Sequence, residues 1–326
     1  MRVSRRLVLA AAAAASVLAM PAAQAQVKWD LPAAYPATNF HTVNLQQFAD
    51  DIDKATGGKL KITVHANASL FKAPEIKRAV QGGQAQIGEI LMVNFQNEWQ
   101  VYGADGLPFL ADSYDSAMKL WRAQKPLVDK KLAEQGMLAL YAVPWPPQGI
   151  YSKKPLNAAA DLKGMKWRAY SPATARIAEL VGAQPVTVQA AELTQALATG
   201  LVESYMSSGS TGADSKTYEH LKYWYDTQAW LPKNLVIVNK AAFDALDAPT
   251  KAAVMKAAAD AEVRGLAASK KTNTESLDKL KAGGMQILPP SAALKADMKK
   301  VGETMLKEWL DKAGPEGKQL VDAFNK

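Results

Sequence analysis

Near its middle, this 326-residue chain reads Pro144-Trp145-Pro146-Pro147-Gln148-Gly149. Proline lacks the backbone N–H donor and fixes its own φ, so three prolines within four residues exclude a continuous helix or an interior strand. The segment therefore predicts a hinge or a crossover between two structural units.

The residues before this crossover alternate between strand and helix patterns. Leu60, Ile62 and Val64 alternate with polar side chains, which indicates a half-buried strand. The predicted strands are 27–31, 59–66, 87–93 and 137–144, and the predicted helices are about 39–56, 74–82 and 113–136. This order is typical of an α/β domain with helices on a largely parallel sheet.

The same alternation returns after the crossover. The sequence predicts a strand ending at Arg168, helices at 172–181 and 190–199, a strand at 185–188 and an extended piece at 202–207. Residues 222–239 predict long strands that pass back to the first unit. Residues 241–284 predict two helices or one bent helix, residues 285–288 a small strand, and residues 291–326 helix with a break at Gly314-Pro315.

A chain that crosses twice between two α/β units predicts a hinged, clam-like fold whose long C-terminal helices brace the hinge. We assign residues 26–147 and about 236–284 to domain I, and residues 148–235 and about 285–326 to domain II. The chain has no cysteine, so its stability must come from hydrophobic cores rather than disulfides.

The first 25 residues predict a secretory signal. Three arginines within Met1–Arg6 precede an apolar run, and Ala23-Gln24-Ala25 supplies a small-x-small cleavage pattern, so the mature chain is expected to begin at Gln26. The pair Arg5-Arg6 also fits a twin-arginine signal, which leaves both the Sec and the Tat route open. Either route predicts a periplasmic protein, and the absence of cysteine excludes a lipid-anchored one.

The formal charge of +8 includes three arginines of the signal, so the rest of the chain is mildly basic. Lys and Arg are scattered among Asp and Glu without the basic block or basic–aromatic interleaving that nucleic-acid grooves use. Nucleic acid is therefore not expected as a partner, and a modest positive field favours small anionic ligands.

Enzyme and metal signatures are weak. His41, His65 and His220 stand far apart without ligand spacing, so we expect no metal, and no cofactor motif is present. Ser208-Gly209-Ser210-Thr211-Gly212 lacks the first glycine of a nucleophile elbow and predicts a flexible polar turn. The pattern favours a binding protein, with a periplasmic enzyme using Glu89 and Lys72 or His41 as the alternative.

Arg168 and Glu89 are the two candidate ligand-binding charges. Arg168 ends the strand that follows Asp161-Leu-Lys-Gly-Met-Lys, where its guanidinium could hold a carboxylate bidentately; a surface salt bridge is the alternative. Glu89 interrupts an otherwise apolar strand and needs a partner, for which a ligand donor or Lys72 is suitable, unless it is solvated at the strand end. Asn39 and Gln148 are expected to cap or line the same cleft.

Ordered segments of the chain resemble the solute receptors of tripartite ATP-independent periplasmic (TRAP) transporters, of the C4-dicarboxylate-binding-receptor type. The resemblance covers the mature length. It rests on Pro74–Val80, Gln86–Glu89, Leu107–Leu110, Gln148–Pro155, Asp161–Arg168 and Gln195–Glu203. The resemblance implies a two-domain periplasmic-binding-protein fold, a TRAP membrane permease as partner and Arg168 as the residue that binds the ligand carboxylate; we expect a monomer.

The chain departs from the family pattern at two positions. Tyr151 stands where many relatives carry a second arginine, and Ser207 or Ser208 where they carry an asparagine. These departures predict a ligand with one carboxylate and a less polar remainder, such as a 2-oxo or 2-hydroxy acid with an apolar or aromatic group. Trp145 and Phe40 would supply an apolar wall, unless both belong to the core. A sensory partner of a membrane kinase is a further alternative.

Overall fold

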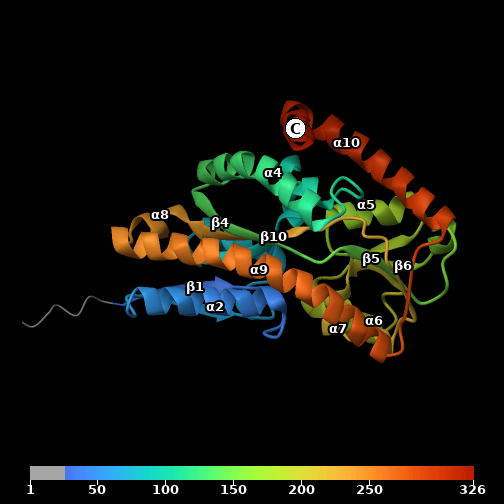
Figure 1. The fold of residues 1–326 in the computed structure, drawn as a ribbon, viewed down its shortest axis with the longest axis horizontal. Coiled ribbons are helices and arrows are strands. Elements are labelled where there is room, and N and C mark those ends of the chain that lie inside the picture. The colour runs from blue at the N-terminus through green and yellow to red at the C-terminus, as the bar shows by residue number, and fades with distance from the viewer. Residues whose placement is uncertain (1–25) are drawn as a thin grey trace, which may run out of the picture.

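The computed structural model describes residues 26–326, so the predicted signal segment lies outside the described residues. The chain forms two α/β lobes joined by crossing segments and by two long helices (Figure 1). The prediction of a two-domain, clam-like fold is confirmed. Within residues 26–326, no helix is long and apolar enough to span a bilayer.

Lobe 1 is built on a two-stranded and a three-stranded sheet. The first pairs β1 (Val27–Pro32) with β2 (Leu60–His65) in parallel, and the second has the order β3 (Ile87–Leu91), β10 (Lys233–Asn239), β4 (Met137–Pro144). The helices are α2 (Phe40–Ala55), α3 (Ile76–Gln81), α4 (Tyr114–Glu134) and α8 (Lys240–Asp244). The 3-10 turns are Ala73–Glu75, Met92–Phe95 and Gln100–Gly106.

The expectation of a largely parallel sheet is wrong for the three-stranded sheet of lobe 1. The returning strand β10 inserts between β3 and β4 and pairs antiparallel with both. The two flanking strands still run in the same direction, as an α/β unit requires, but strand β10 comes from much later in the chain. A pattern read along the sequence cannot reveal this insertion, because the pairing is set by long-range register.

Lobe 2 contains a six-stranded sheet. Its order is β11 (Gln286–Leu288), β9 (Tyr223–Tyr225), β5 (Gln148–Ser152), β8 (Ser204–Ser208), β6 (Lys166–Ala169), β7 (Gln184–Thr187). The helices are α5 (Pro172–Leu180), α6 (Leu193–Ala198) and α7 (Gly209–Asp214). The 3-10 turns are Ala159–Leu162, Ala190–Glu192 and Thr217–Glu219.

Ser208–Gly212 is not the flexible polar turn that the sequence predicts. Ser208 ends β8, and its Oγ accepts a hydrogen bond from the Thr211 N–H, so the following residues begin helix α7. A serine at this position satisfies one of the free N–H groups at a helix start.

The proline-rich crossover leads from β4 of lobe 1 to β5 of lobe 2. Trp145 N–H donates to the Pro232 carbonyl and Gln148 N–H donates to the Trp230 carbonyl, so the outgoing and returning segments lie side by side. A Cβ at Gly149 would lie 2.5 Å from the Trp224 ring, which explains why glycine follows the prolines.

Two long helices bind the lobes together (Figure 1). Helix α9 (Ala248–Ala282) packs against α2 and β4 of lobe 1 and against α7 and β11 of lobe 2. Helix α10 (Ala292–Asn325) packs against α4 of lobe 1 and α5 of lobe 2 and is kinked at Gly314, where φ is +58°. The domain boundaries given above remain a prediction, since both helices contact both lobes.

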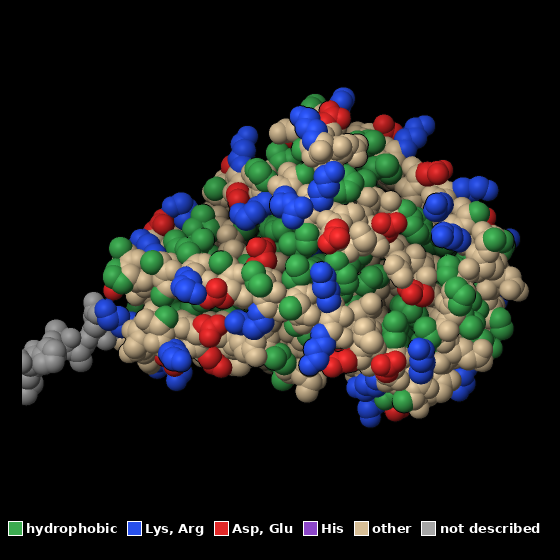
Figure 2. Space-filling view, in the orientation of Figure 1, with side chains coloured by type: hydrophobic (Ala, Val, Ile, Leu, Met, Phe, Trp, Pro, Cys, Tyr) green, Lys and Arg blue, Asp and Glu red, His purple; other side chains and the backbone are tan. Residues whose placement is uncertain are grey.

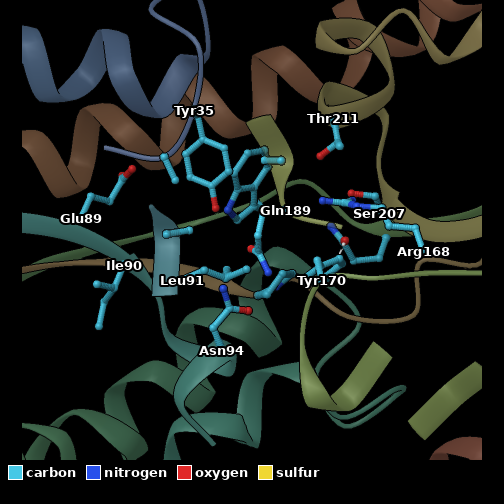
Figure 3. A pocket seen from close by; sticks show the side chains of 16 residues that line it. Tyr35, Glu89, Ile90, Leu91, Asn94, Arg168, Tyr170, Gln189, Ser207 and Thr211 are labelled. Carbon is cyan, nitrogen blue, oxygen red and sulfur yellow. Dashed lines mark hydrogen bonds between the residues drawn. The ribbon is translucent and has the colours of Figure 1, made fainter. Parts of the chain in front are cut away.

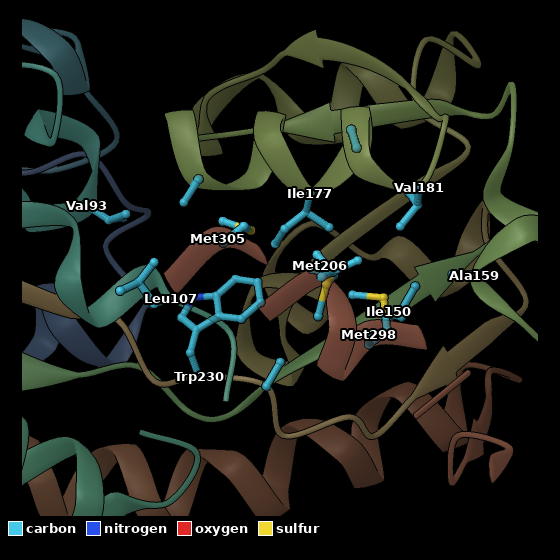
Figure 4. Packing of buried hydrophobic residues seen from close by; sticks show 14 of the residues in the cluster. Val93, Leu107, Ile150, Ala159, Ile177, Val181, Met206, Trp230, Met298 and Met305 are labelled. Carbon is cyan, nitrogen blue, oxygen red and sulfur yellow. The ribbon is translucent and has the colours of Figure 1, made fainter. Parts of the chain in front are cut away.

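A large apolar core extends beneath α10. Met298 and Met305 of α10 pack with Ile177 of α5, Ile150 of β5 and Trp230 of the returning segment (Figure 4). Burying such side chains contributes roughly 1.5–3 kcal/mol each. On the face shown in Figure 2, Lys and Arg are interspersed with Asp and Glu, as the sequence predicts.

Candidate functional site

The two lobes enclose a cavity close to the crossing segments (Figure 3). The space between atoms in this region amounts to about 580 Å³, which includes space open to solvent. Glu89 and Arg168 lie on opposite sides of it, with Tyr35 and Gln189 between them. The polar side chains on its wall are those of Tyr35, Glu89, Asn94, Gln148, Arg168, Tyr170, Gln189, Ser207 and Thr211.

Arg168 is a buried cation with no counter-ion among residues 26–326. It lies on β6 and is 3% exposed; its Nε donates to the Val188 carbonyl at 3.0 Å, and Nη1 has no hydrogen-bond partner among residues 26–326. Its guanidinium lies over the rings of Tyr170 and Tyr205, 5.1 and 5.6 Å from their centroids. Burial lowers the pKa of Arg168. A desolvated guanidinium held this way is suited to a carboxylate ligand.

Glu89 is a buried carboxyl group on the opposite wall. It is 4% exposed, and its Oε1 lies 3.5 Å from His41 Nδ1. Burial raises the pKa of Glu89 to about 8, although the neighbouring Asn234 side chain acts to lower it. Burial also lowers the pKa of His41 well below its usual range. Both groups are therefore largely uncharged at neutral pH, and their contact is not an ion pair.

Aromatic side chains form the wall beside Glu89. The Trp145 ring lies edge-on to Tyr35 with 4.8 Å between ring centroids, and its Nε1 donates to Asn234 Oδ1 at 2.8 Å. Phe40 does not line the cavity; it packs behind Trp145, 5.4 Å away, as part of the lobe 1 core. A single aromatic wall, fixed by a hydrogen bond, can therefore contact the flat face of a ligand.

A second cavity adjoins the first and shares Tyr35, Trp145, Ala190 and Thr211 with it. At its edge, Asn39 Nδ2 of lobe 1 donates to Asp214 Oδ2 of lobe 2 at 2.7 Å, while Asn39 Oδ1 caps α2. The carboxyl of Asp214 has a raised pKa because of partial burial. One asparagine thus starts a helix and joins the two lobes.

Asn39 variants should weaken ligand binding through faster dissociation. Asn39→Ser keeps a capping oxygen but loses the donor to Asp214, so we expect about 3–10-fold weaker affinity. Asn39→Asp places two carboxylates together, so we expect a larger loss of ligand affinity at neutral pH. This loss should become smaller as the pH falls and Asp214 becomes protonated. Stopped-flow dissociation rates at two pH values check this. Asn239→Asp, at the cap of α8 and away from the lobe contact, is the control, and equal effects at both sites would contradict the prediction.

The remaining predicted site residues fall into three groups. Gln148 and Ser207 line the cavity; the Gln148 side chain donates to the Pro146 carbonyl and accepts from Tyr170 OH. Ser208 caps α7. Lys72 is exposed and does not line the cavity, and its backbone N–H donates to Glu75 Oε2; the predicted pairing with Glu89 is wrong.

Sequence reasoning missed several wall residues. They are Tyr35, Asn94, Tyr170, Gln189 and Thr211. Most follow a strand or open a short helix, where polar residues are too common to mark a site. The side-chain amides of Asn94, Gln148 and Gln189 also make the wall more polar than we expected for a ligand with one carboxylate and a less polar remainder.

A cavity between two lobes with a buried guanidinium on its wall is typical of a solute-binding receptor. The model for the family described as bacterial extracellular solute-binding protein, family 7, matches residues 33–312, and the chain belongs to this family. The prediction of a TRAP-type receptor is thereby confirmed, and the enzyme alternative is set aside.

Solved structures of receptors share both fold and sequence with the chain. DctP6 of Bordetella pertussis, a receptor that binds pyroglutamic acid, is 61% identical over 92% of this chain and 99% of its own, with a TM-score of 0.91. A marine metagenome TRAP protein specific for pyroglutamate is 46% identical over 92% and 99%, with a TM-score of 0.90. DctP7 of Bordetella pertussis, which also binds pyroglutamic acid, is 44% identical over 92% and 100%, with a TM-score of 0.91.

Proposed function

We propose that the protein binds a small cyclic monocarboxylate of the pyroglutamate type between its lobes and delivers it to a TRAP permease. The observation that carries the proposal is Arg168, a buried guanidinium on the cavity wall with no carboxylate partner among the described residues. One cation fits one carboxylate, and Tyr151, in place of a second arginine, is buried with its OH bonded to the Ser208 carbonyl.

The ligands of the three similar receptors support this class over the 2-oxo or 2-hydroxy acids with an apolar or aromatic group that the sequence suggested. Pyroglutamate carries one carboxylate on a flat five-membered lactam ring. The ring suits the face of Trp145, and the lactam suits the polar groups on the wall. Under this proposal the protein works in the periplasm as a monomer after cleavage of residues 1–25.

Melting temperatures of purified residues 26–326 test the proposal, because a ligand that binds only the native state raises them. We expect pyroglutamate to give a clear increase, with succinate, galactonate and glucuronate giving little or none. Calorimetry on the same ligands would supply affinities. If dicarboxylates or sugar acids raise the melting temperature as much as pyroglutamate does, the assignment to cyclic monocarboxylates fails.

A further inference from the structure

Binding of a ligand carboxylate by Arg168 does not explain why a second ionisable group, Glu89, is buried in the cavity wall. Arg168 accounts for one end of a ligand, yet the wall of lobe 1 presents a second buried ionisable group, Glu89, on the opposite side of the cavity (Figure 3). Its Oε2 has no hydrogen-bond partner among residues 26–326, and neither has Oδ1 of Asn94, another residue that lines the cavity. Buried polar atoms are rarely left without partners, so both atoms are suited to groups of the ligand.

In the part of the chain that the structure describes, no Lys or Arg is paired with Glu89. Val236 of strand β10 pairs with Glu89, and the Asn234 side chain of the same strand lies close enough to lower the pKa of Glu89. Lys77 of α3 is directed to Glu98. Arg264 of α9 is bonded to Asn44 and Asp51. The titratable groups that face the carboxyl group from the other packed elements are His41, Tyr35 and Tyr141.

We propose that Glu89 acts as a neutral carboxylic acid that recognises the amide edge of a lactam, and so selects lactam acids among cyclic carboxylates. A lactam fixes its N–H and C=O on the same side, because the ring forces the amide to be cis. A carboxylic acid presents O–H and C=O in the same spacing. The two groups therefore form a pair of parallel hydrogen bonds, in which the acid donates to the lactam oxygen and accepts from the lactam N–H.

This inference rests on the proposed function, since it supplies the second half of the same site. Arg168 would bind the carboxylate from lobe 2, and Glu89 would bind the lactam edge from lobe 1, so one ligand would connect both lobes. Contacts made to both lobes at once are those that favour closure over the open form. An ionised Glu89 would instead lose its donor and favour a cationic amine.

If Glu89 must be protonated to bind, the affinity for a lactam acid should depend on pH in a characteristic way. The pKa of Glu89 is raised to about 8 by burial, so the acid form predominates at pH 7 and the carboxylate at pH 9. Affinity for a lactam acid should then be nearly constant up to neutral pH and fall about tenfold between pH 7 and pH 9. The pKa values of His41, Tyr35 and Tyr141 are shifted away from this window, the first downward and the tyrosines upward.

Calorimetry with four ligands on the full mature protein is the first test. The ligands are pyroglutamate, its ring-oxygen lactone analogue, proline and cyclopentanecarboxylate, all of which carry one carboxylate for Arg168. We expect the lactone, proline and carbocycle to bind about 10–100-fold more weakly than pyroglutamate, because each leaves a hydrogen-bonding group of the wall unmatched. Equal affinity for all four, or preference for proline, overturns the role of Glu89 while leaving the carboxylate site standing. No binding of any of them overturns the proposed function itself.

Two variants make the second test. Glu89→Gln has an amide that both donates and accepts but does not titrate, so its affinities for pyroglutamate at pH 7 and pH 9 should be equal. Glu89→Met should bind pyroglutamate and the carbocycle with similar affinity, having lost the lactam preference. Glu134→Gln, at an exposed glutamate of α4, controls for the same substitution away from the cavity and should keep the tenfold fall in affinity between pH 7 and pH 9. If the affinity of Glu89→Gln for pyroglutamate still falls between pH 7 and pH 9, the proposal is wrong.

Discussion

Arg168→Met is expected to abolish measurable ligand binding while raising the stability of the ligand-free protein. Removing one member of a buried charge pair in a complex costs roughly 2–5 kcal/mol or more, equivalent to about 30–5,000-fold in affinity. In the ligand-free protein, Arg168 is desolvated without a counter-ion, as its lowered pKa indicates. Replacing it with an unbranched apolar side chain should therefore stabilise the fold by about 1–3 kcal/mol.

Calorimetric titration and urea unfolding of the same preparation check both parts of this prediction. Arg168→Lys keeps the charge but loses the planar fork and the Nε bond to the Val188 carbonyl, so it should also bind poorly. Arg176→Met is the matched control, because Arg176 lies on α5 at the surface, paired with Glu179 and Glu308. Retained affinity in Arg168→Met would remove the central residue of the site.

The order of strands and helices could be predicted because local signals determine it. The prolines at 144, 146 and 147 placed the crossover, and Gly314-Pro315 placed the break in α10, since both residue types constrain the backbone directly. The position of β10 between β3 and β4 could not be predicted, because pairing partners this far apart in the chain leave no periodic signal.

Some residues of the site could be predicted from the sequence and others could not. Glu89 stood out because a charge inside a strand otherwise fit for burial needs a partner, and Arg168 because it ends a strand where its planar guanidinium can hold a carboxylate. Trp145 and Phe40 looked equivalent in sequence, yet only Trp145 reaches the cavity, because the rotation of α2 turns Phe40 into the core. Tyr35, Asn94 and Gln189 lie in short connecting segments whose course depends on packing that no local pattern specifies.

Lys233→Met is expected to destabilise the protein by roughly 3–5 kcal/mol, because it leaves a buried carboxylate without its cation. The side chains of Lys233 and Asp105 are fully buried, with Nζ 3.8 Å from Oδ2, and Oδ2 also accepts from the Lys233 N–H at 2.7 Å. Lys233 is the first residue of β10, where the chain re-enters lobe 1, so the pair fixes the returning segment against the turn Gln100–Gly106.

The effect of Lys233→Met should depend on pH with a definite sign. Burial raises the pKa of Asp105 to about 6 although Lys233 lowers it, so without the lysine the folded-state pKa rises further above the ordinary value. The folded variant then binds more protons than the unfolded chain, and its stability is lost as the pH rises from about 4 through the new pKa. Urea unfolding at pH 5 and pH 8 should show a larger loss of unfolding free energy, relative to the unsubstituted protein, at pH 8.

Asp105→Leu combined with Lys233→Met removes both charges and should recover most of the lost stability, because a buried ion pair contributes little net stability over apolar residues of similar volume. A double variant as unstable as Lys233→Met would show that packing at β10, rather than the stranded charge, sets the cost.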